Sequence, residues 1–206
     1  MAEDCGNHEE DKRRHLYHRL FVGFLVLVIA VLLTVLIIWL ALRPTKPAFR
    51  LEDASLLELN LTLTPSSNSP ILSAVFQITL SSRNPNDRVG VYYDRLDAFL
   101  LYDAQRVSAA TSLPAGYQGH GDVTVWSTYL SGGGTLLAPY MADSLAQDER
   151  AGFILFHLRV DGRLRWKVGS WMSSRYPLRV SCPALFAVDG DSGFRFQRSP
   201  ECSVDI

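Results

Sequence analysis

The stretch from Phe21 to Leu42, FVGFLVLVIAVLLTVLIIWLAL, contains no charged residue in 22 positions. Because a helix rises ~1.5 Å per residue, this run would span about 33 Å, close to the ~30 Å hydrocarbon core of a bilayer. A cleaved signal peptide usually has an apolar region of only ~7 to 15 residues that ends in small residues. This run is longer and ends in IIWLAL. We therefore predict an uncleaved transmembrane helix over residues 21–42.

Basic residues near this helix leave its orientation almost balanced, because four precede it and three follow it closely. Glycosylation gives a further criterion, since Asn60-Leu61-Thr62 forms an acceptor site that is used only in the secretory lumen. We therefore expect a cytoplasmic N-terminus and an extracytoplasmic C-terminal part, the single-pass type II arrangement, with Asn60 as the candidate glycosylation site.

The cysteines agree with this orientation. Cys182 and Cys202 both follow the helix, whereas Cys5 precedes it. A disulfide between Cys182 and Cys202 fits an oxidising compartment and would stabilise the domain by ~3 kcal/mol in the chain-entropy model. Two buried free thiols are the alternative.

Charge patterning limits the classes of partner. Residues 1–20 are mostly polar and charged, so we expect a disordered cytoplasmic tail. Residues 43–206 carry equal numbers of basic and acidic residues. A nucleic-acid partner would require a basic excess, so none is expected.

Beyond residue 49 the sequence has the two-residue period of β-strands. Leu57, Leu59, Leu61 and Leu63 alternate with polar residues, so we expect them on one buried face with Asn60 pointing outward. The same alternation predicts a second strand whose buried residues are Ala74, Phe76, Ile78 and Leu80.

Further segments rich in β-branched and aromatic residues raise the expected number of strands to about eight. The segment 138–152 favours helix only weakly, and we expect a connection of one or two turns there. Many antiparallel strands without a strong helix predict an all-β protein, a β-sandwich of the immunoglobulin or fibronectin III kind, after the single transmembrane helix. The antibody pattern of Cys, Trp and Cys is absent.

Asp161-Gly162 separates two alternating runs and predicts a hairpin with a bulged three-residue turn. That register places Leu158, Leu164 and Trp166 on the core side. The opposite face could contact acidic polysaccharide or lipid headgroups, although a solvated strand face is the more common use of such a stripe. The basic residues of this face are Arg159, Arg163, Arg165 and Lys167.

Catalytic and metal sites find little support in the sequence. Gly190-Asp191-Ser192-Gly193 resembles the nucleophile loop of chymotrypsin-like proteases, but a serine needs a base and only His120 and His157 follow the helix. The same segment lacks the ligands of a calcium hand, and the cysteines lack zinc-site spacing. We therefore expect no catalytic residue, no cofactor site and no metal site.

Two other features have structural interpretations. Ser131 to Thr135 is glycine-rich without a P-loop lysine, so we expect a flexible loop tip. Trp126, Trp166 and Trp171 could form a sugar-binding platform, but core positions are more usual in a domain of this size.

Asn84-Pro85-Asn86 is a turn with a physical mechanism, because proline fixes φ and both asparagines readily bond to nearby backbone. The chain should reverse or change sheets there. Followed by Tyr92-Tyr93, by WKVGSWMSSRYPLRVSCP and by a terminal CSVDI, the motif resembles the plant family named for non-race-specific disease resistance and harpin-induced proteins. The domain of that family is the second late embryogenesis abundant group, also called the water-stress and hypersensitive-response domain.

The resemblance implies a plasma-membrane protein of plants with an outer β-sandwich, which we expect to have no enzymatic activity. Whether the chain gathers at plasmodesmata is left open by the sequence. Implied roles are defence, the hypersensitive response, stress signalling and contact between plasma membrane and cell wall. Expected partners are the lipid bilayer, unidentified defence proteins and cell-wall polysaccharide. Protection of membranes or proteins during water loss is the alternative, and a surface serine hydrolase using Ser192 is the least favoured. The expected layout is a tail over 1–20, the helix over 21–42, a stalk and first strand over 43–70, and the sandwich over 71–206.

Overall fold

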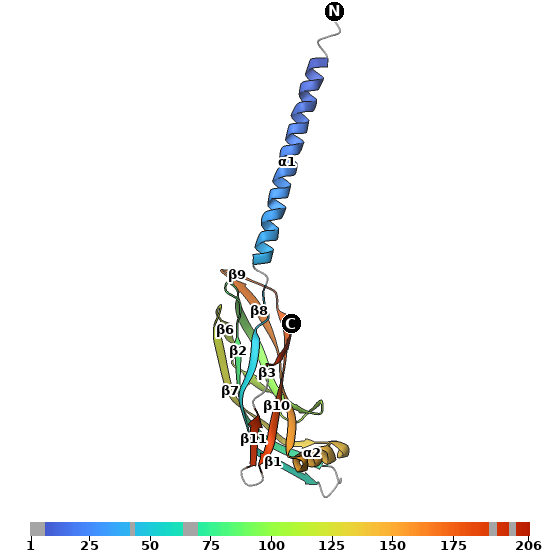
Figure 1. Cartoon of the computed structure of the whole chain (residues 1–206), viewed down its shortest axis with the longest axis vertical. Coiled ribbons are helices and arrows are strands. Elements are labelled where there is room, and N and C mark those ends of the chain that lie inside the picture. Colours follow the sequence, from blue (N-terminus) through green and yellow to red (C-terminus); the bar gives the residue numbers. More distant parts are fainter. Residues whose placement is uncertain (1–6, 42–43, 64–69, 190–192, 198–200) are drawn as a thin grey trace, which may run out of the picture. The chain divides into compact units, whose positions relative to one another are not determined.

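The computed structural model describes residues 7–41, 44–63, 70–189, 193–197 and 201–206. By internal contacts the chain divides into two units, 1–43 and 44–206. The first contains one helix, α1 (Asn7–Ala41), and the second contains the strands and helix α2 (Pro139–Ala151) (Figure 1). The prediction of an all-β sandwich preceded by one long apolar helix is confirmed.

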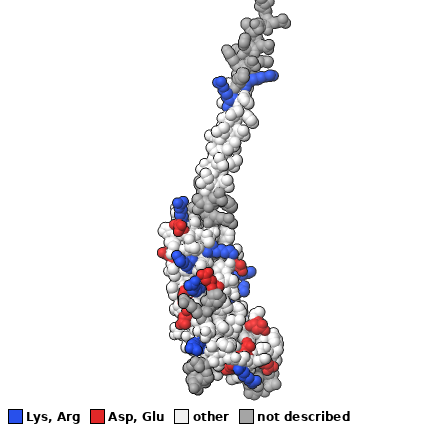
Figure 2. Space-filling view, viewed as in Figure 1, with Lys and Arg blue, Asp and Glu red and all other residues white. Residues whose placement is uncertain are grey.

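Helix α1 is longer than the predicted membrane segment. Its stretch Leu16–Ile37 is long and apolar enough to cross a bilayer. Nearly all side chains of this stretch are exposed, and beyond Arg19 the helix carries no charged residue, as the white surface in Figure 2 shows. The helix begins at Asn7, so the predicted disorder of residues 1–20 is wrong from that residue onward. Once a helix has been nucleated, each added residue gains a hydrogen bond and need not form a new nucleus.

Two antiparallel sheets form the 44–206 unit. The smaller sheet has the strand order β1-β2-β7, and the larger has the order β11-β10-β8-β3-β4, with β5 and β6 on β3, β9 on β8 and β12 on β10. The strands are β1 (Ala48–Leu63), β2 (Pro70–Arg83), β3 (Gly90–Tyr102), β4 (Gln105–Arg106), β5 (Thr111–Leu113), β6 (Gly116–Gln118), β7 (Val123–Leu136), β8 (Phe153–Val168), β9 (Trp171–Met172), β10 (Tyr176–Asp189), β11 (Gly193–Gln197) and β12 (Ser203–Asp205).

The core lies between the inner faces of the two sheets. Phe76 from β2 meets Phe156 from β8 edge to face, with ring centroids 5.0 Å apart, and Phe186 from β10 packs against both. Such pairs add ~0.5–1.5 kcal/mol each to the effect of area burial. The predicted inner face of β2 is confirmed, because Ala74, Phe76, Ile78 and Leu80 are all buried.

Strand β1 corrects the predicted leucine face. A bulge between Leu51 and Asp53 shifts the phase and buries Leu56, and a second bulge between Leu56 and Glu58 leaves Leu57 57% exposed. Leu59 packs against the core, but Leu61 is 41% exposed, so the prediction fails for Leu57 and Leu61. The side chain of Leu63 lies outside the described residues. The buried start of β1 also makes residues 44–63 part of the sandwich itself.

Strand β8 corrects the predicted hairpin. It runs without a turn from Phe153 to Val168, and Asp161 and Gly162 pair with both neighbouring strands. A Cβ at Gly162 would collide with the backbone oxygen of Arg95 and approach Leu96 Cδ2 to 2.7 Å, since β3 bulges at this level. Gly162 is therefore required by a close backbone approach and not by a turn.

Helix α2 was expected as one or two turns but has 13 residues. Pro139 opens it, and Gly152 closes it at φ 89° with its N–H donating to the carbonyls of Asp148 and Glu149. Its buried residues Met141 and Leu145 cover one end of the core. Tertiary packing thus completes a helix whose propensity alone is moderate.

Candidate functional site

Asn84 is fully buried where the chain leaves the smaller sheet at Arg83 and joins the larger sheet at Gly90. Its Nδ2 donates to the carbonyls of Val89 and Gly119, both at 2.8 Å. The expected change of sheets at this motif is confirmed. The hydrogen bonds made by Asn84 replace those of a regular strand at the crossing.

Asn86 ties this junction to the start of the domain. Its Nδ2 donates to the carbonyl of Thr45 and to Asn84 Oδ1, both at 2.8 Å, and its Oδ1 accepts from the Thr45 N–H at 2.7 Å. Its own N–H also donates to Asn84 Oδ1, at 3.1 Å. The side-chain amide of Asn86 therefore uses both its N–H donors and its Oδ1 acceptor within the domain. Pro85, between the two asparagines, is exposed.

Tyr92 and Tyr93 lie on opposite faces of β3. Tyr93 is buried, and its hydroxyl hydrogen-bonds Ser82 Oγ at 2.8 Å and Gln118 Oε1 at 3.0 Å. Burial raises the pKa of Tyr93, the Ser82 hydrogen bond opposing this effect, so the hydroxyl stays protonated. Tyr92 lies on the outer face under Arg165. Gln118 was not identified from the sequence, because a glutamine in a short strand has no distinguishing pattern.

The predicted basic residues do share the outer face of β8, but most of their charges have local partners. Arg159 pairs with Asp161 at 3.4 Å, and the ammonium of Lys167 lies 4.7 Å from the ring centre of Tyr117. Arg163 is exposed opposite Arg95. The stripe is therefore less electropositive than its sequence alone indicates.

Arg165 and Arg175 converge on Asp94. Both Nε and Nη2 of Arg165 bond Asp94 Oδ1, and Arg175 Nε bonds Oδ2 at 3.0 Å. Desolvation raises the pKa of Asp94, but the hydrogen bonds and charges of the two arginines outweigh it and hold the pKa below its ordinary value. Beside this cluster is an open depression of about 690 Å³. Its lining residues are Asp94, Arg95, Asp97, Asp161, Gly162, Arg163 and Arg175.

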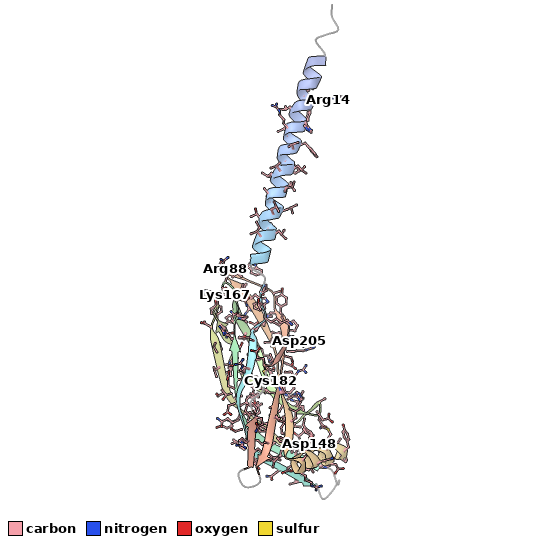
Figure 3. The ribbon with its side chains drawn as sticks, in the orientation of Figure 1. Arg14, Arg88, Asp148, Lys167, Cys182 and Asp205 are labelled. Atoms are coloured by element: carbon pink, nitrogen blue, oxygen red, sulfur yellow. A yellow bond between two sulfur atoms is a disulfide. The ribbon has the colours of Figure 1, made fainter. Side chains whose placement is uncertain are left out.

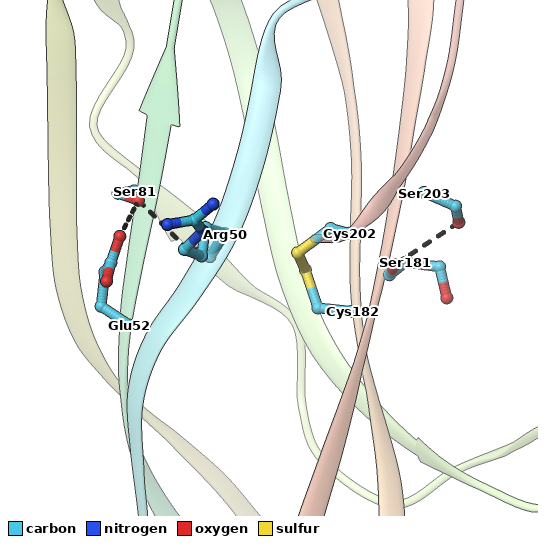
Figure 4. The surroundings of a disulfide bond; sticks show 7 residues. All are labelled: Arg50, Glu52, Ser81, Ser181, Cys182, Cys202 and Ser203. Atoms are coloured by element: carbon cyan, nitrogen blue, oxygen red, sulfur yellow. Dashed lines mark hydrogen bonds between the residues drawn. A yellow bond between two sulfur atoms is a disulfide. The ribbon is translucent and has the colours of Figure 1, made fainter. Parts of the chain in front are cut away.

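Cys182 and Cys202 form a disulfide (Figure 4). Cys182 lies in β10, and Cys202 directly precedes β12, whose residues pair with Arg179–Ser181 of β10. The N–H of Cys202 donates to the carbonyl of Phe49 in β1 at 3.0 Å. The C-terminal segment therefore joins the larger sheet to the edge of the smaller one.

Asn60 is exposed on β1, and its Nδ2 donates to Glu58 Oε1 at 2.9 Å. The acceptor amide thus lies on the domain surface, as N-glycosylation requires.

The residues considered for catalysis do not assemble into a described site. Ser192 lies outside the described residues. His157 is on the outer face of β8, and His120 is in the turn before β7. No cluster of three or more potential metal ligands occurs among the residues that the structure describes.

Comparisons with known proteins identify the family. The family model described as Late embryogenesis abundant protein matches residues 79–182. The protein named NDR1/HIN1-like protein 1, from Arabidopsis thaliana, is 39% identical, with 99% of this chain and 100% of that relative covered. The chain belongs to the NDR1/HIN1-like family. NDR1/HIN1-like protein 12 of the same plant is 35% identical over 100% of this chain and 99% of its own.

Among solved structures, the solution structure of an Arabidopsis thaliana protein aligns over 70% of this NDR1/HIN1-like chain and 83% of its own, with 13% identity and a TM-score of 0.40. The names of these relatives include no enzyme.

Proposed function

We propose that this NDR1/HIN1-like chain is a membrane-anchored protein without enzymatic activity that acts in plant defence or stress signalling through contacts of an extracytoplasmic β-sandwich. One observation carries the proposal: a helix of membrane-spanning length leads directly into a self-contained domain whose motif side chains are engaged in holding that domain together. Asn84, Asn86 and Tyr93 all have internal hydrogen-bond partners. Side chains engaged in this way stabilise the domain and are not free to act on a substrate.

The domain surface supports contact with other molecules. On the face drawn in Figure 2, basic and acidic side chains are interspersed over the 44–206 unit. The depression next to Asp94 combines arginines and aspartates, a polar arrangement suited to hydrogen-bonded contact with a protein or a cell-wall polysaccharide. A mixed surface of this kind favours specific over purely electrostatic association.

Removing the outer domain tests this proposal in plants that lack the native protein. A chain ending after the helix should fail to restore the immunity or stress phenotype, whereas the full chain should restore it. Equal rescue by both chains would contradict a role for the domain. Rescue by a Ser192→Ala variant is expected as well, since the proposal assigns no reaction to Ser192.

A second candidate is protection of membranes or proteins during water loss, the alternative implied by the resemblance to the late embryogenesis abundant group. The extensive ordered core distinguishes this domain from disordered protectants that act by solvation. Reduced survival of desiccation in plants lacking the protein, with unchanged immunity, would favour this candidate.

A further inference from the structure

Strands β8 and β9 form a tight hairpin at one end of the domain. Val168 pairs with Trp171 across a two-residue turn, and Gly169 adopts a φ of 58°, which glycine tolerates without strain. Ser173 follows β9 and stabilises the hairpin at the end away from the turn. Its N–H donates to the Trp166 carbonyl and its Oγ accepts from the Trp166 N–H, both at 2.9 Å. The turn is therefore a fixed support for the side chains that it presents.

Those side chains are large, apolar and exposed. Trp171 is 63% exposed and Met172 is 38% exposed. Tyr117 on β6, which β3 and β8 separate from β9, is 52% exposed. We call these three residues the Trp171 tip. Tryptophan is highly buried on average, and the other two tryptophans of this domain follow that rule. Exposed apolar side chains on a braced hairpin, together with Tyr117 on β6, indicate a contact surface at this end of the domain.

The chain enters the domain at the same end. Lys167, the β8 partner of Met172, also pairs with Gly90, which follows closely on the Asn86 junction that binds Thr45. Arg88 and Lys167 lie at this end of the domain in Figure 3, and Asp148 lies toward the other end. Helix α1 ends at Ala41, so three residues at ~3.6 Å each allow Pro44 to lie at most about 11 Å from its last residue. This connection is too short to carry Pro44 far from a membrane that holds the helix.

The charges around the tip fit the phosphates of lipid headgroups. The Lys167 ammonium lies 4.7 Å from the ring centre of Tyr117, and Arg88 is exposed at the same end of the domain (Figure 3). Asp87 and Asp122 are also exposed and balance the charges of Arg88 and Lys167. Binding would therefore depend mainly on the apolar side chains, since Trp and Tyr favour the membrane interface.

We propose that Trp171, Met172 and Tyr117 insert into the headgroup region of the phospholipid bilayer that holds the chain's own helix. The inference rests on the membrane anchorage proposed above, and it adds a second contact that fixes the orientation of the domain on the membrane. The outer face of β8 and the depression next to Asp94 would then stand at a constant angle to the bilayer.

Tryptophan quenching in the full chain tests this contact. The chain carries Trp39→Phe to remove the tryptophan of the apolar run and is placed in phosphatidylcholine nanodiscs with lipids brominated near the headgroup. Quenching of the fluorescence is expected, and Trp171→Phe should abolish most of it because Trp126 and Trp166 are buried. As a matched control, Tyr140→Trp in the Trp171→Phe chain places an exposed tryptophan on α2. This tryptophan should be quenched by acrylamide in water but not by the brominated lipid.

An alkaline carbonate wash of vesicles containing the same chain separates the two proposals. Release from the vesicles would contradict the anchor, and the inference would fail with it. A retained chain whose Trp171 is not quenched by brominated lipid would contradict the inference alone. Protection of Trp171 from acrylamide by soluble cell-wall oligosaccharide, without lipid quenching, would also contradict it and would assign the tip to sugar binding.

Discussion

The side-chain amide of Asn86 pairs with the backbone of Thr45 in both directions, its Nδ2 donating at 2.8 Å and its Oδ1 accepting at 2.7 Å. This pairing copies the exchange of hydrogen bonds between two strands, although it involves only one side chain. It fixes the first residues of the domain to the crossing between the two sheets. The family motif therefore determines where the domain begins.

Replacing Asn86 tests this role. Asn86→Ala removes three side-chain hydrogen bonds, two to Thr45 and one to Asn84. At ~1 kcal/mol for each bond, the free energy of unfolding should fall by about 2–4 kcal/mol. Urea unfolding measures the change. Asp87→Ala, at an exposed neighbouring position, is the control and should stay within ~0.5 kcal/mol of the wild type. Equal effects of the two substitutions would contradict the structural role of Asn86.

The disulfide gives a second prediction. Cys202→Ser should lower the free energy of unfolding by ~3 kcal/mol, because the bond between Cys182 and Cys202 restricts the unfolded chain. Reductant should lower the stability of the wild type by a similar amount and have no further effect on the variant. If reductant changed both chains equally, the effect would not arise from this bond.

Asp94 predicts a dependence of stability on pH. Its folded-state pKa lies below the ordinary value, so its ion pairs stabilise the fold fully above the unfolded-state pKa of ~3.9 and lose this effect as the pH falls further, through the folded-state pKa. Asp94→Asn should lower stability at pH 7 and flatten the loss of stability below about pH 5. Urea unfolding at several pH values measures both effects. Curves for variant and wild type that remain parallel down to pH 3 would exclude this contribution.

Gly162 tests the unbroken β8 strand. A Cβ at this position would meet the Arg95 carbonyl and Leu96, so Gly162→Ala should destabilise the domain by at least ~1–3 kcal/mol. Gly133→Ala is the matched control, since a Cβ there has no neighbour within 4 Å. Gly133→Ala should leave stability unchanged or raise it slightly. Thermal unfolding of both variants and the wild type measures the two effects. A tolerated Gly162→Ala would favour a turn at Asp161-Gly162.

Much of the fold followed from local sequence patterns. The membrane-length helix, the sandwich class and the inner faces of β2 and β8 all depend on apolar periodicity, which the sequence displays directly. The alternation along β8 was assigned correctly even though the turn was not. A three-residue turn and a continuous strand place the same β8 side chains inward, so the wrong turn did not alter the predicted core face. Only the β3 bulge beside residue 162 explains why that residue is glycine.

The errors arose where a partner strand decides the outcome. The Ser131–Thr135 segment was expected as a loop tip but belongs to β7, where Gly132 packs closely against the Val107 carbonyl. Trp171 was expected in the core and is exposed at a hairpin tip. The partners of Asp94, at Arg165 and Arg175, lie far from it in the sequence. Such contacts depend on sheet register, which periodicity alone does not specify.

Glycosylation of Asn60 reports directly on the proposed extracytoplasmic position of the domain, because the modifying enzyme acts only in the secretory lumen. The full chain is expressed in plant cells with a C-terminal tag, next to Asn60→Gln and Thr62→Ala variants. For an extracytoplasmic domain we expect a shift in electrophoretic mobility that peptide N-glycosidase removes and both variants lack, with the tag protected from protease in sealed microsomes. An unglycosylated chain whose tag is digested in sealed microsomes would place the domain in the cytosol and contradict the proposed topology.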